Sequence, residues 1–202
     1  MVFLIIKDLN DEREEAVSTA IDFLRYGRII VYPTDTVYGI GADATDESAV
    51  RKVFDVKKRS LSKPISIMVS DKSMIEDYAE VEGISNEIID EFLPGPLTLL
   101  LPKKNLPDVL TADQKKVGVR IIDGPVRDII SGAGFPITTT SANISGEGSS
   151  RKFGDAIKDL DVDLGLDGGD CPGGTPSTVF DPEEWKVIRE GPIKKEEIDE
   201  LE

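Results

Sequence analysis

The chain has 202 residues and a formal net charge of −15, from 39 Asp and Glu against 24 Lys and Arg. This balance argues against indiscriminate binding to nucleic acid or to an anionic membrane, so any site for a polyanion must be local. The absence of His and the presence of a single Cys, Cys171, exclude His-based general-base catalysis, Ser-His-Asp triads, zinc ligand sets and disulfide frameworks.

An alternation of strands and helices begins at the N-terminus. Residues 2–6 form a β-branched run that predicts a strand, and this run is too short for a signal peptide or a membrane span. We therefore expect a cytoplasmic protein that does not contact a membrane. Asp11 and Glu14 have the spacing of a capping box for a helix that runs to Gly27. A strand is expected next, over residues 29–32.

The alternation continues to the C-terminus. Residues 34–41 are expected to form a loop, after which Thr45 can cap a second helix. Further strands are expected over residues 65–69, 97–101, 117–122, 137–140, 177–180 and 185–189. Further helices are expected around residues 74–78, 85–92, 126–130 and 153–160, with a frayed helix over 194–202.

No linker, repeat or low-complexity tract interrupts this pattern. It predicts a single α/β domain over residues 1–202, with a core from about residue 10 to 192 and an acidic tail over 193–202. We expect a twisted sheet of mixed parallel and antiparallel strands with flanking helices.

A basic window stands out against the acidic chain. Between residues 51 and 63 there are six basic residues and one acidic residue, Asp55. The basic residues are Arg51, Lys52, Lys57, Lys58, Arg59 and Lys63. The window indicates an anion site, although Lys and Arg at a helix end also simply complement the helix dipole.

Hydroxyl and amide side chains collect where the predicted strands run into loops. They belong to Thr34, Thr36, Thr138, Thr139, Thr140, Ser141, Asn143, Ser145, Ser149, Ser177 and Thr178. Ligands of α/β sheets bind at strand ends, and these neutral groups suit carboxylate, carbamate and phosphate oxygens. Turn chemistry explains any one such cluster, but several clusters together with a basic window favour a binding site. The Gly-rich stretch 165–175 is compatible with a movable lid or with a plain turn.

Seven motifs spread along nearly the whole chain carry a family resemblance. They are Tyr32-Pro-Thr-Asp-Thr-Val-Tyr-Gly-Ile-Gly-Ala-Asp43, Lys57-x-Arg59 with Lys63-Pro64, Pro94-Gly-Pro-Leu-Thr-Leu99, Val117-Gly-Val-Arg120, Thr139-Thr-Ser-Ala-Asn-Ile-Ser-Gly146, Thr175-Pro-Ser-Thr-Val179 and Ile188-Arg-Glu-Gly-Pro192. In this order they resemble the YrdC family of threonylcarbamoyl-AMP synthases in its single-domain form. The resemblance implies a YrdC-like fold with a basic concave cavity.

The resemblance also implies an activity. Such enzymes are nucleotidyltransferases that condense L-threonine, bicarbonate and ATP into threonylcarbamoyl-AMP and release pyrophosphate. A tRNA threonylcarbamoyl transferase then uses this product to form N6-threonylcarbamoyladenosine in tRNA. Mg²⁺ is expected on the ATP phosphates, with no dedicated metal ligands in the protein.

By motif position the resemblance implies two sets of site residues. The residues implied to contact ATP are Lys57, Arg59, Lys63, Ser141, Asn143, Ser149 and Arg189. The residues implied to hold threonine are Thr36, Arg120, Thr139 and Ser177. From its chemistry alone, Arg120 can grip a carboxylate in a bidentate fork that a Lys could not reproduce. Lys57, Arg59 and Lys63 can help to bring two anions, a carbamate and a phosphate, together.

Two positions depart from the family pattern, and two other functions remain open. Longer members often have Asn at the position of Lys63, and His near threonine at the position of Met68. Met68 cannot make the same hydrogen bond, which leaves the shape of the amino-acid pocket open. One alternative function is a non-catalytic RNA-binding protein that uses the same basic cavity for tRNA or double-stranded RNA. The other is a carbamoyl- or adenylate-transfer domain that works inside a larger assembly.

Overall fold

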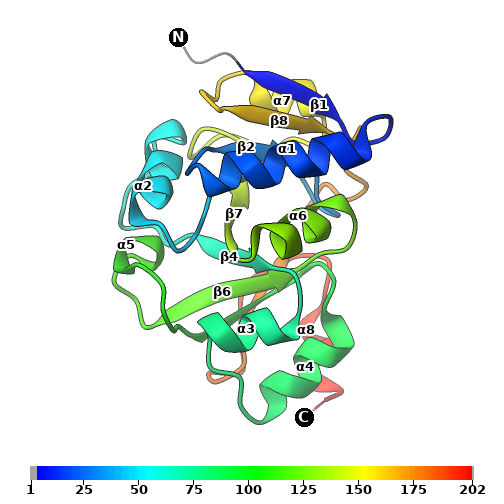
Figure 1. The fold of residues 1–202 in the computed structure, drawn as a ribbon. Helices are drawn as coiled ribbons and strands as arrows, with labels where there is room; N and C mark the ends of the chain where they lie inside the picture. The colour runs from blue at the N-terminus through cyan, green and yellow to red at the C-terminus, as the bar shows by residue number, and fades with distance from the viewer. Residues whose placement is uncertain (1–3, 202) are drawn as a thin grey trace.

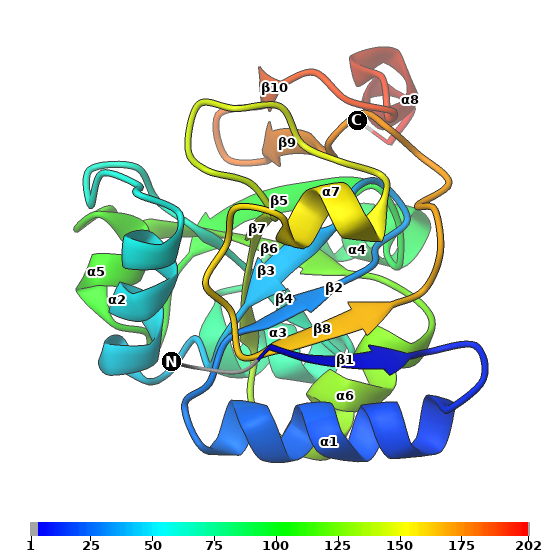
Figure 2. The ribbon, with the colours of Figure 1, turned by 90° about the horizontal axis from the view of Figure 1, so that it is seen from above.

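A twisted, mixed sheet forms the centre of the computed structural model, which describes residues 4–201 (Figures 1 and 2). Within that range ten strands make one sheet in the order β1-β8-β2-β3-β7-β4-β6-β5-β9-β10. The strands are β1 (Ile5–Asp8), β2 (Ile30–Tyr32), β3 (Gly39–Gly41), β4 (Ser66–Val69), β5 (Leu97–Pro102), β6 (Lys116–Ile121), β7 (Ile137–Ser141), β8 (Leu164–Asp167), β9 (Thr178–Asp181) and β10 (Lys186–Arg189). Parallel pairs such as β4 with β6 and antiparallel pairs such as β5 with β6 confirm the predicted mixed sheet.

Eight helices flank the sheet within the described residues. They are α1 (Arg13–Arg25), α2 (Glu47–Val56), α3 (Lys72–Tyr78), α4 (Ile84–Phe92), α5 (Asp108–Thr111), α6 (Pro125–Ala133), α7 (Phe153–Ile157) and α8 (Lys195–Asp199). Helices α1 and α6 lie side by side against one face of the sheet, where Leu24 and Ile129 belong to one buried cluster (Figure 1). No helix in this part of the chain combines the length and the apolar character that a membrane span requires.

Several local predictions are wrong, and short-range geometry explains why. The expected loop over 34–41 contains strand β3, whose glycines leave room for the Tyr32 ring. A Cβ at Gly39 would lie 2.8 Å from Tyr32 Cε2. The cap of α2 is Asp46 rather than Thr45, because the Asp46 carboxylate accepts from the backbone N–H of Ser48 at 2.8 Å.

Other elements begin differently or were missed. Helix α1 starts at Arg13 after Glu12 without a side-chain capping bond, so the capping box expected from Asp11 is wrong. Strand β8 was not predicted, because Gly165 interrupts its short apolar run. It nevertheless pairs with both β1 and β2. Val2 and Phe3 of the first predicted strand lie outside the described residues.

The C-terminal segment is ordered rather than frayed. Ile198 on α8 is fully buried, and the indole Nε1 of Trp185 donates to the Asp199 carboxylate at 2.9 Å. Helix α8 thereby packs beside β9 and β10 at the end of the sheet opposite to β1 (Figure 2).

Strand β7 joins the two halves of the sheet and brings polar groups to its middle. It pairs with β3 on one side, where Ser141 is opposite Gly39. On the other side it pairs with β4, where Thr139 is opposite Ser66. Since neighbouring strands are about 5 Å apart, this register places hydroxyls from different parts of the chain within one small region.

Candidate active site

A cavity of about 210 Å³ opens where β7 meets its neighbours. Its polar lining comes from Thr34, Thr36, Tyr38, Arg59, Ser66, Thr98, Arg120, Thr139, Thr140, Ser141, Ser177 and Arg189. The lining thus contains three arginines and, within residues 4–201, no Asp or Glu. In a chain with a net charge of −15, this is the local basic hollow that the sequence predicts.

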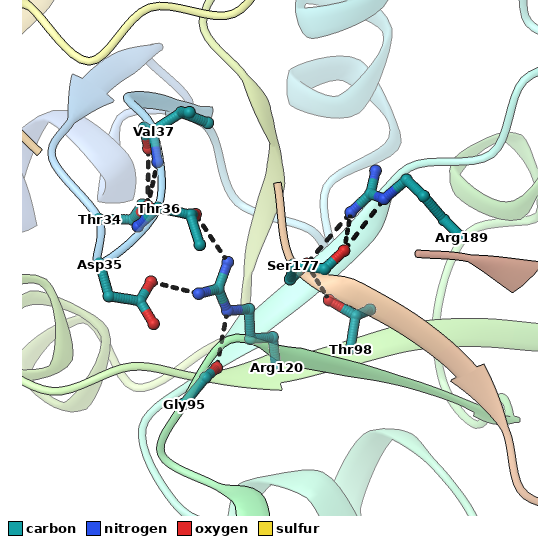
Figure 3. Close-up of polar contacts among 9 residues, drawn as sticks. All are labelled: Thr34, Asp35, Thr36, Val37, Gly95, Thr98, Arg120, Ser177 and Arg189. Carbon is teal, nitrogen blue, oxygen red and sulfur yellow. Dashed lines mark hydrogen bonds and ion pairs between the residues drawn. The ribbon is translucent and has the colours of Figure 1, made fainter. Parts of the chain in front are cut away.

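Arg120 on β6 is the buried cation of the cavity, with 5% of its surface exposed. Its Nε donates to the carbonyl oxygen of Gly95 at 3.1 Å, its Nη1 donates to Thr36 Oγ1 at 3.3 Å, and its Nη2 pairs with the Asp35 carboxylate (Figure 3). Burial lowers the pKa of Arg120 and Asp35 opposes that shift, so the guanidinium stays charged. Each Nη nitrogen carries two N–H groups, so among the described residues one N–H on each has no partner and can donate to an anion.

The loop after β2 is shaped by the Thr34 side chain. Thr34 Oγ1 accepts the backbone N–H groups of Thr36 and Val37 at 3.1 and 3.2 Å and donates to the Val37 carbonyl oxygen at 2.6 Å. This turn holds Thr36, which is 2% exposed, against Arg120. The loop therefore fixes the positions of two polar groups of the cavity before any ligand binds.

A second group of polar contacts lies across the cavity (Figure 3). Arg189 donates from Nε and Nη2 to the carbonyl oxygen of Ser177 at 3.0 and 2.7 Å, and from Nη2 to Ser177 Oγ at 3.1 Å. Ser177 Oγ is also 2.8 Å from Thr98 Oγ1 on β5. These bonds connect β10, β9 and β5 at one wall of the cavity.

Arg59 reaches the cavity from the loop after α2. Its Nε donates to the carbonyl oxygen of Lys63 at 3.1 Å and its Nη2 donates to that of Pro64 at 2.8 Å. These two bonds hold the loop around the half-buried guanidinium. Burial lowers the pKa of Arg59. Within residues 4–201 the other N–H groups of Arg59 have no partner and can donate to an anion.

Lys57 is placed differently from the other basic residues. It is 1% exposed, and its ammonium donates to the carbonyl oxygens of Ser141 and Asn143, the latter at 2.7 Å. In return, its own carbonyl oxygen accepts the backbone N–H of Ser145 at 2.8 Å. Burial, with a smaller contribution from the Arg59 charge, lowers the pKa of Lys57 to about 8. Lys57 joins the end of α2 to the loop after β7 and does not line the cavity.

The cavity brings together seven of the predicted site residues: Thr36, Arg59, Arg120, Thr139, Ser141, Ser177 and Arg189. Lys57, Lys63, Asn143 and Ser149 are not among its lining residues. The Lys63 and Ser149 side chains are exposed. Asn143 donates to the carbonyl oxygens of Ile144 and Glu147, and its buried Oδ1 has no hydrogen-bond partner in the structure.

The basic window is not one surface, which corrects its interpretation as a single anion site. Arg51 pairs with Glu47 at 2.7 Å, and Lys52 donates to the carbonyl oxygen of Gly27 at 2.9 Å. Only Arg59 of this window lines the cavity. Arg51 lies on the surface of α2 outside its last turn, so neither the anion site nor the helix dipole explains it.

Four polar residues of the site are missing from the predicted set. Ser66 and Thr98 line the cavity from β4 and β5, Tyr38 lines it from the position before β3, and Asp35 pairs with Arg120. The available signal for Ser66 and Thr98 was a hydroxyl within an otherwise apolar strand. Gly118 lies close to both side chains. A Cβ at this position would be 2.3 Å from Ser66 Oγ and 3.0 Å from Thr98 Cγ2.

Met68 lies beneath the site rather than in its lining. It is fully buried and is the register partner of Arg120 across β4 and β6 and of Ile137 across β4 and β7. It belongs to the same apolar cluster as Tyr32 and Ile129. At this position a thioether supports Arg120 by packing and offers the cavity no strong hydrogen bond.

The fold and the cavity define a class of mixed α/β protein with an arginine-containing, hydroxyl-lined cavity at the centre of one sheet. Residues 22–191 match the Sua5/YciO/YrdC family model, whose description reads "Telomere recombination". The chain belongs to this family.

Individual relatives extend over nearly the whole chain. A Methanocaldococcus jannaschii protein, provisionally named threonylcarbamoyl-AMP synthase, is 44% identical over 94% of this chain and 94% of its own length. The threonylcarbamoyl-AMP synthase of Pyrococcus abyssi is 35% identical over 98% of this chain, which spans 60% of that relative. The solved structure of P. abyssi Sua5 complexed with L-threonine has a TM-score of 0.90 and 33% identity, covering 98% of this chain and 60% of that one.

Proposed function

We propose that this chain is an L-threonylcarbamoyladenylate synthase, which condenses L-threonine, bicarbonate and ATP into threonylcarbamoyl-AMP, pyrophosphate and water. The observation that carries the proposal is one cavity that joins three arginines to a set of hydroxyls in a strongly acidic chain. The synthase names of the relatives and the complex of P. abyssi Sua5 with L-threonine support the same substrate class.

The reaction is compatible with a site that lacks a His, Cys or metal nucleophile. The threonine amine forms a bond to the carbon of bicarbonate, and water leaves, which yields a carbamate. A carbamate oxygen then attacks the α-phosphorus of ATP, and the bond from that phosphorus to the bridging oxygen breaks to release pyrophosphate. Both partners of the second step are anions, so positioned cations and donors are what this step requires.

The described side chains divide this work. Arg120, with its two unpartnered N–H groups, suits the threonine carboxylate, and Thr36, Thr139 and Ser177 lie beside it in the same lining. Arg59, Ser141 and Arg189 suit the triphosphate, since they offer two guanidinium groups and a hydroxyl. Mg²⁺ would enter bound to the ATP phosphates, because the lining has no carboxylate among residues 4–201 to hold it.

Lys57, Lys63, Asn143 and Ser149 take other parts in this proposal. Lys57 and Asn143 hold the backbone of the loop after β7, next to Ser141. Lys63 and Ser149 are exposed, and we propose that they contact ATP only where its phosphates extend beyond the cavity. In the cytoplasm the product would pass to a tRNA threonylcarbamoyl transferase.

The non-catalytic RNA-binding alternative is less well supported. A phosphate backbone is bound mainly by exposed cations. Such binding does not require a cavity that is lined with hydroxyls. Here the basic window includes one buried amine, Lys57, and one cation paired within a helix, Arg51. The arrangement therefore favours small anionic substrates over an extended nucleic acid.

The test is pyrophosphate release by the purified protein with ATP, bicarbonate and radiolabelled L-threonine. Release that requires all three substrates, together with label in an adenylate, supports the proposal. Release that is independent of threonine or of bicarbonate contradicts it. Titration with a tRNA as a separate measurement distinguishes the RNA-binding alternative.

A further inference from the structure

The loop between α2 and β4 presents a leucine between two lysines at the surface of the molecule. Leu61 is 48% exposed, and Lys58 and Lys63 are exposed on either side of it. Within residues 4–201 neither lysine forms an ion pair. In a chain with a net charge of −15, this basic loop (residues 58–63) is a local reversal of sign.

Hydrogen bonds within the basic loop fix its backbone on both sides of Leu61. Arg59 Nε donates to the carbonyl oxygen of Lys63 at 3.1 Å. The backbone N–H of Lys63 donates to the carbonyl oxygen of Ser60 at 3.0 Å, and the hydroxyl oxygens of Ser60 and Ser62 are 2.8 Å apart. A loop that is held in one conformation loses little conformational entropy when it binds a partner.

An apolar pocket of about 490 Å³ opens at the end of β5. Its apolar lining includes Ile84 of α4, Leu100 of β5 and Pro182 after β9. Ile84 and Leu100 are only partly buried. A Cβ at Gly83, which also lines the pocket, would have no neighbour within 4 Å, so this side of the pocket is open. Such a pocket can receive an apolar side chain of another molecule.

Carboxylates surround this acidic pocket. Glu80, Glu82 and Glu183 belong to its lining and are exposed. Glu183 pairs with Lys116 at 2.6 Å, whereas Glu80 and Glu82 have no ion-pair partner among the described residues. The acidic pocket and the basic loop are therefore complementary. One offers an apolar hollow with free carboxylates, and the other offers a leucine with free ammonium groups.

The basic loop and the acidic pocket flank the same short helix, α5, which lies beside α2 (Figures 1 and 2). The backbone N–H of Ile65, just after the loop, donates to the carbonyl oxygen of Leu110 on α5 at 2.8 Å. Lys103, directly after β5, pairs with Asp108 and donates to Thr111 Oγ1 at 2.9 Å. A two-fold axis near α5 can therefore bring the loop of each copy to the pocket of the other.

We propose that two copies of this chain form a two-fold dimer, in which Leu61 of each copy enters the acidic pocket of the other and Lys58 lies beside Glu80 and Glu82. The inference goes beyond the proposed function and does not depend on it. In a two-fold dimer the same pair of surfaces meets twice, so each contact is reciprocated. The like net charges of the two copies oppose association at long range. At about 0.15 M salt this repulsion is screened beyond about 8 Å, whereas close pairs are screened less.

Sedimentation equilibrium of the full chain in about 0.15 M NaCl tests the dimer. We expect the average mass to rise with concentration from that of one chain toward that of two. Lys58→Glu places like charges in both contacts of its own dimer, and so does the double variant Glu80→Lys with Glu82→Lys. We expect each variant alone to weaken self-association at least tenfold.

A 1:1 mixture of these two variants is the decisive sample. In the mixed dimer a glutamate at position 58 meets the two introduced lysines, and Lys58 of the other chain meets Glu80 and Glu82. Both contacts thus regain opposite charges, so we expect the mixture to associate within about threefold of the wild type. Recovery also shows that both variants are folded.

Matched controls separate the contact from general charge and hydrophobicity. Lys158→Glu changes the net charge as Lys58→Glu does, at an exposed position after α7. Leu61→Ser removes the apolar part of the contact. Its control is Ile188→Ser, because Ile188 is 53% exposed but lies on β10. We expect Leu61→Ser to weaken self-association at least tenfold and both controls to leave it within about twofold.

Several results would overturn the inference. One is a wild-type mass that stays that of a single chain up to about 1 mM. Another is a dimer that the charge variants leave unchanged, or a mixture that does not regain association. A mass that passes beyond two chains contradicts the reciprocal arrangement. Pyrophosphate release is measured separately, so a failure of the dimer and a failure of the proposed function are distinguishable.

Discussion

At the residue scale, the site depends on cations that are held in place before a ligand binds. Arg120 is paired with Asp35, Arg59 is held by two carbonyls of its own loop, and Arg189 is held by Ser177. Such preorganised donors do not have to reorient during the reaction, which is why they stabilise developing charge effectively.

Arg59→Ala tests this directly. We expect it to lower kcat/KM for pyrophosphate release at least 30-fold, which corresponds to ~2 kcal/mol of transition-state stabilisation. Arg51→Ala is the matched control, since Arg51 belongs to the same basic window but is exposed and pairs with Glu47 on α2. Equal kcat/KM of the two variants would show that the Arg59 guanidinium stabilises its own loop and does not stabilise the transition state.

Gly118→Ala tests the floor of the cavity. The added methyl group would lie 2.3 Å from Ser66 Oγ, so Ser66 must turn into the cavity or the strands must separate. We expect threonine affinity to fall about tenfold while the protein stays folded. Gly154→Ala is the control, because a Cβ at Gly154 has no neighbour within 4 Å. Calorimetric titration with L-threonine measures the affinity of both variants. Equal affinities would contradict the prediction.

The buried amine of Lys57 gives a pH-dependent prediction. Its pKa is about 8 in the folded chain against an ordinary value of 10.5, because burial disfavours the charged form. Between these two pH values the unfolded chain binds a proton that the folded chain does not, so the free energy of unfolding rises with pH. From pH 8 to 10.5 we expect the wild type to gain ~2 kcal/mol relative to Lys57→Met.

Denaturant unfolding at several pH values measures this difference. Lys58→Met, at an exposed neighbouring position, is the control and is expected to follow the wild type. A Lys57→Met protein whose stability runs parallel to that of the wild type over this range would contradict the prediction.

At the scale of elements, helix α8 shows that an acidic segment can still be part of the core. Ile198 is fully buried and Trp185 is bonded to Asp199, while Phe180 on β9 packs edge-on against the Trp185 ring with centroids 5.2 Å apart. The helix thereby supports β9, which directly follows Ser177, and β10, which ends at Arg189.

We expect Ile198→Ala to lower the free energy of unfolding by about 3 kcal/mol, as for other large-to-small changes in a core. Because the same helix supports the Ser177 wall, threonine affinity should fall as well. Glu200→Ala is the control, since Glu200 is exposed on the same segment. Denaturant unfolding measures the change, and a loss below about 1 kcal/mol would mean that α8 frays as the sequence pattern suggests.

At the scale of the whole molecule, the cavity depends on both halves of the sheet. Thr36 and Thr139 belong to the half that contains β2, β3 and β7, whereas Arg120 and Ser177 belong to the half that contains β6 and β9. Ligand binding should therefore stabilise the molecule as one unit, and unfolding should occur in one transition.

Fluorescence of the single Trp185 and far-UV circular dichroism test this prediction, because Trp185 reports on the end of the sheet near β10. We expect both signals to change with the same midpoint. We also expect MgATP at about 100 times its Kd to add ~2.7 kcal/mol to the free energy of unfolding. Separate midpoints, or a shift confined to one signal, would contradict a shared site.

The sequence alone determined the fold class, most of the strands and helices, and the residue types that surround the cavity. Hydrophobic periodicity and turn residues are local signals, so they predicted elements such as β4 and α4 within about two residues. The seven motifs identified the family and seven of the residues that line the cavity. The charge balance predicted that any basic site would be local.

Only the tertiary structure decided which polar groups meet and in what state. The pairing of Asp35 with Arg120, the burial of Lys57 and the position of Gly118 between Ser66 and Thr98 depend on contacts between segments far apart in the chain. Strands β3 and β8 form for the same reason, since their neighbours complete their hydrogen bonds although their own glycine-containing sequences favour loops. Hydrogen-bond direction at the cavity is settled by the partners that packing supplies, and local sequence carries no record of those partners.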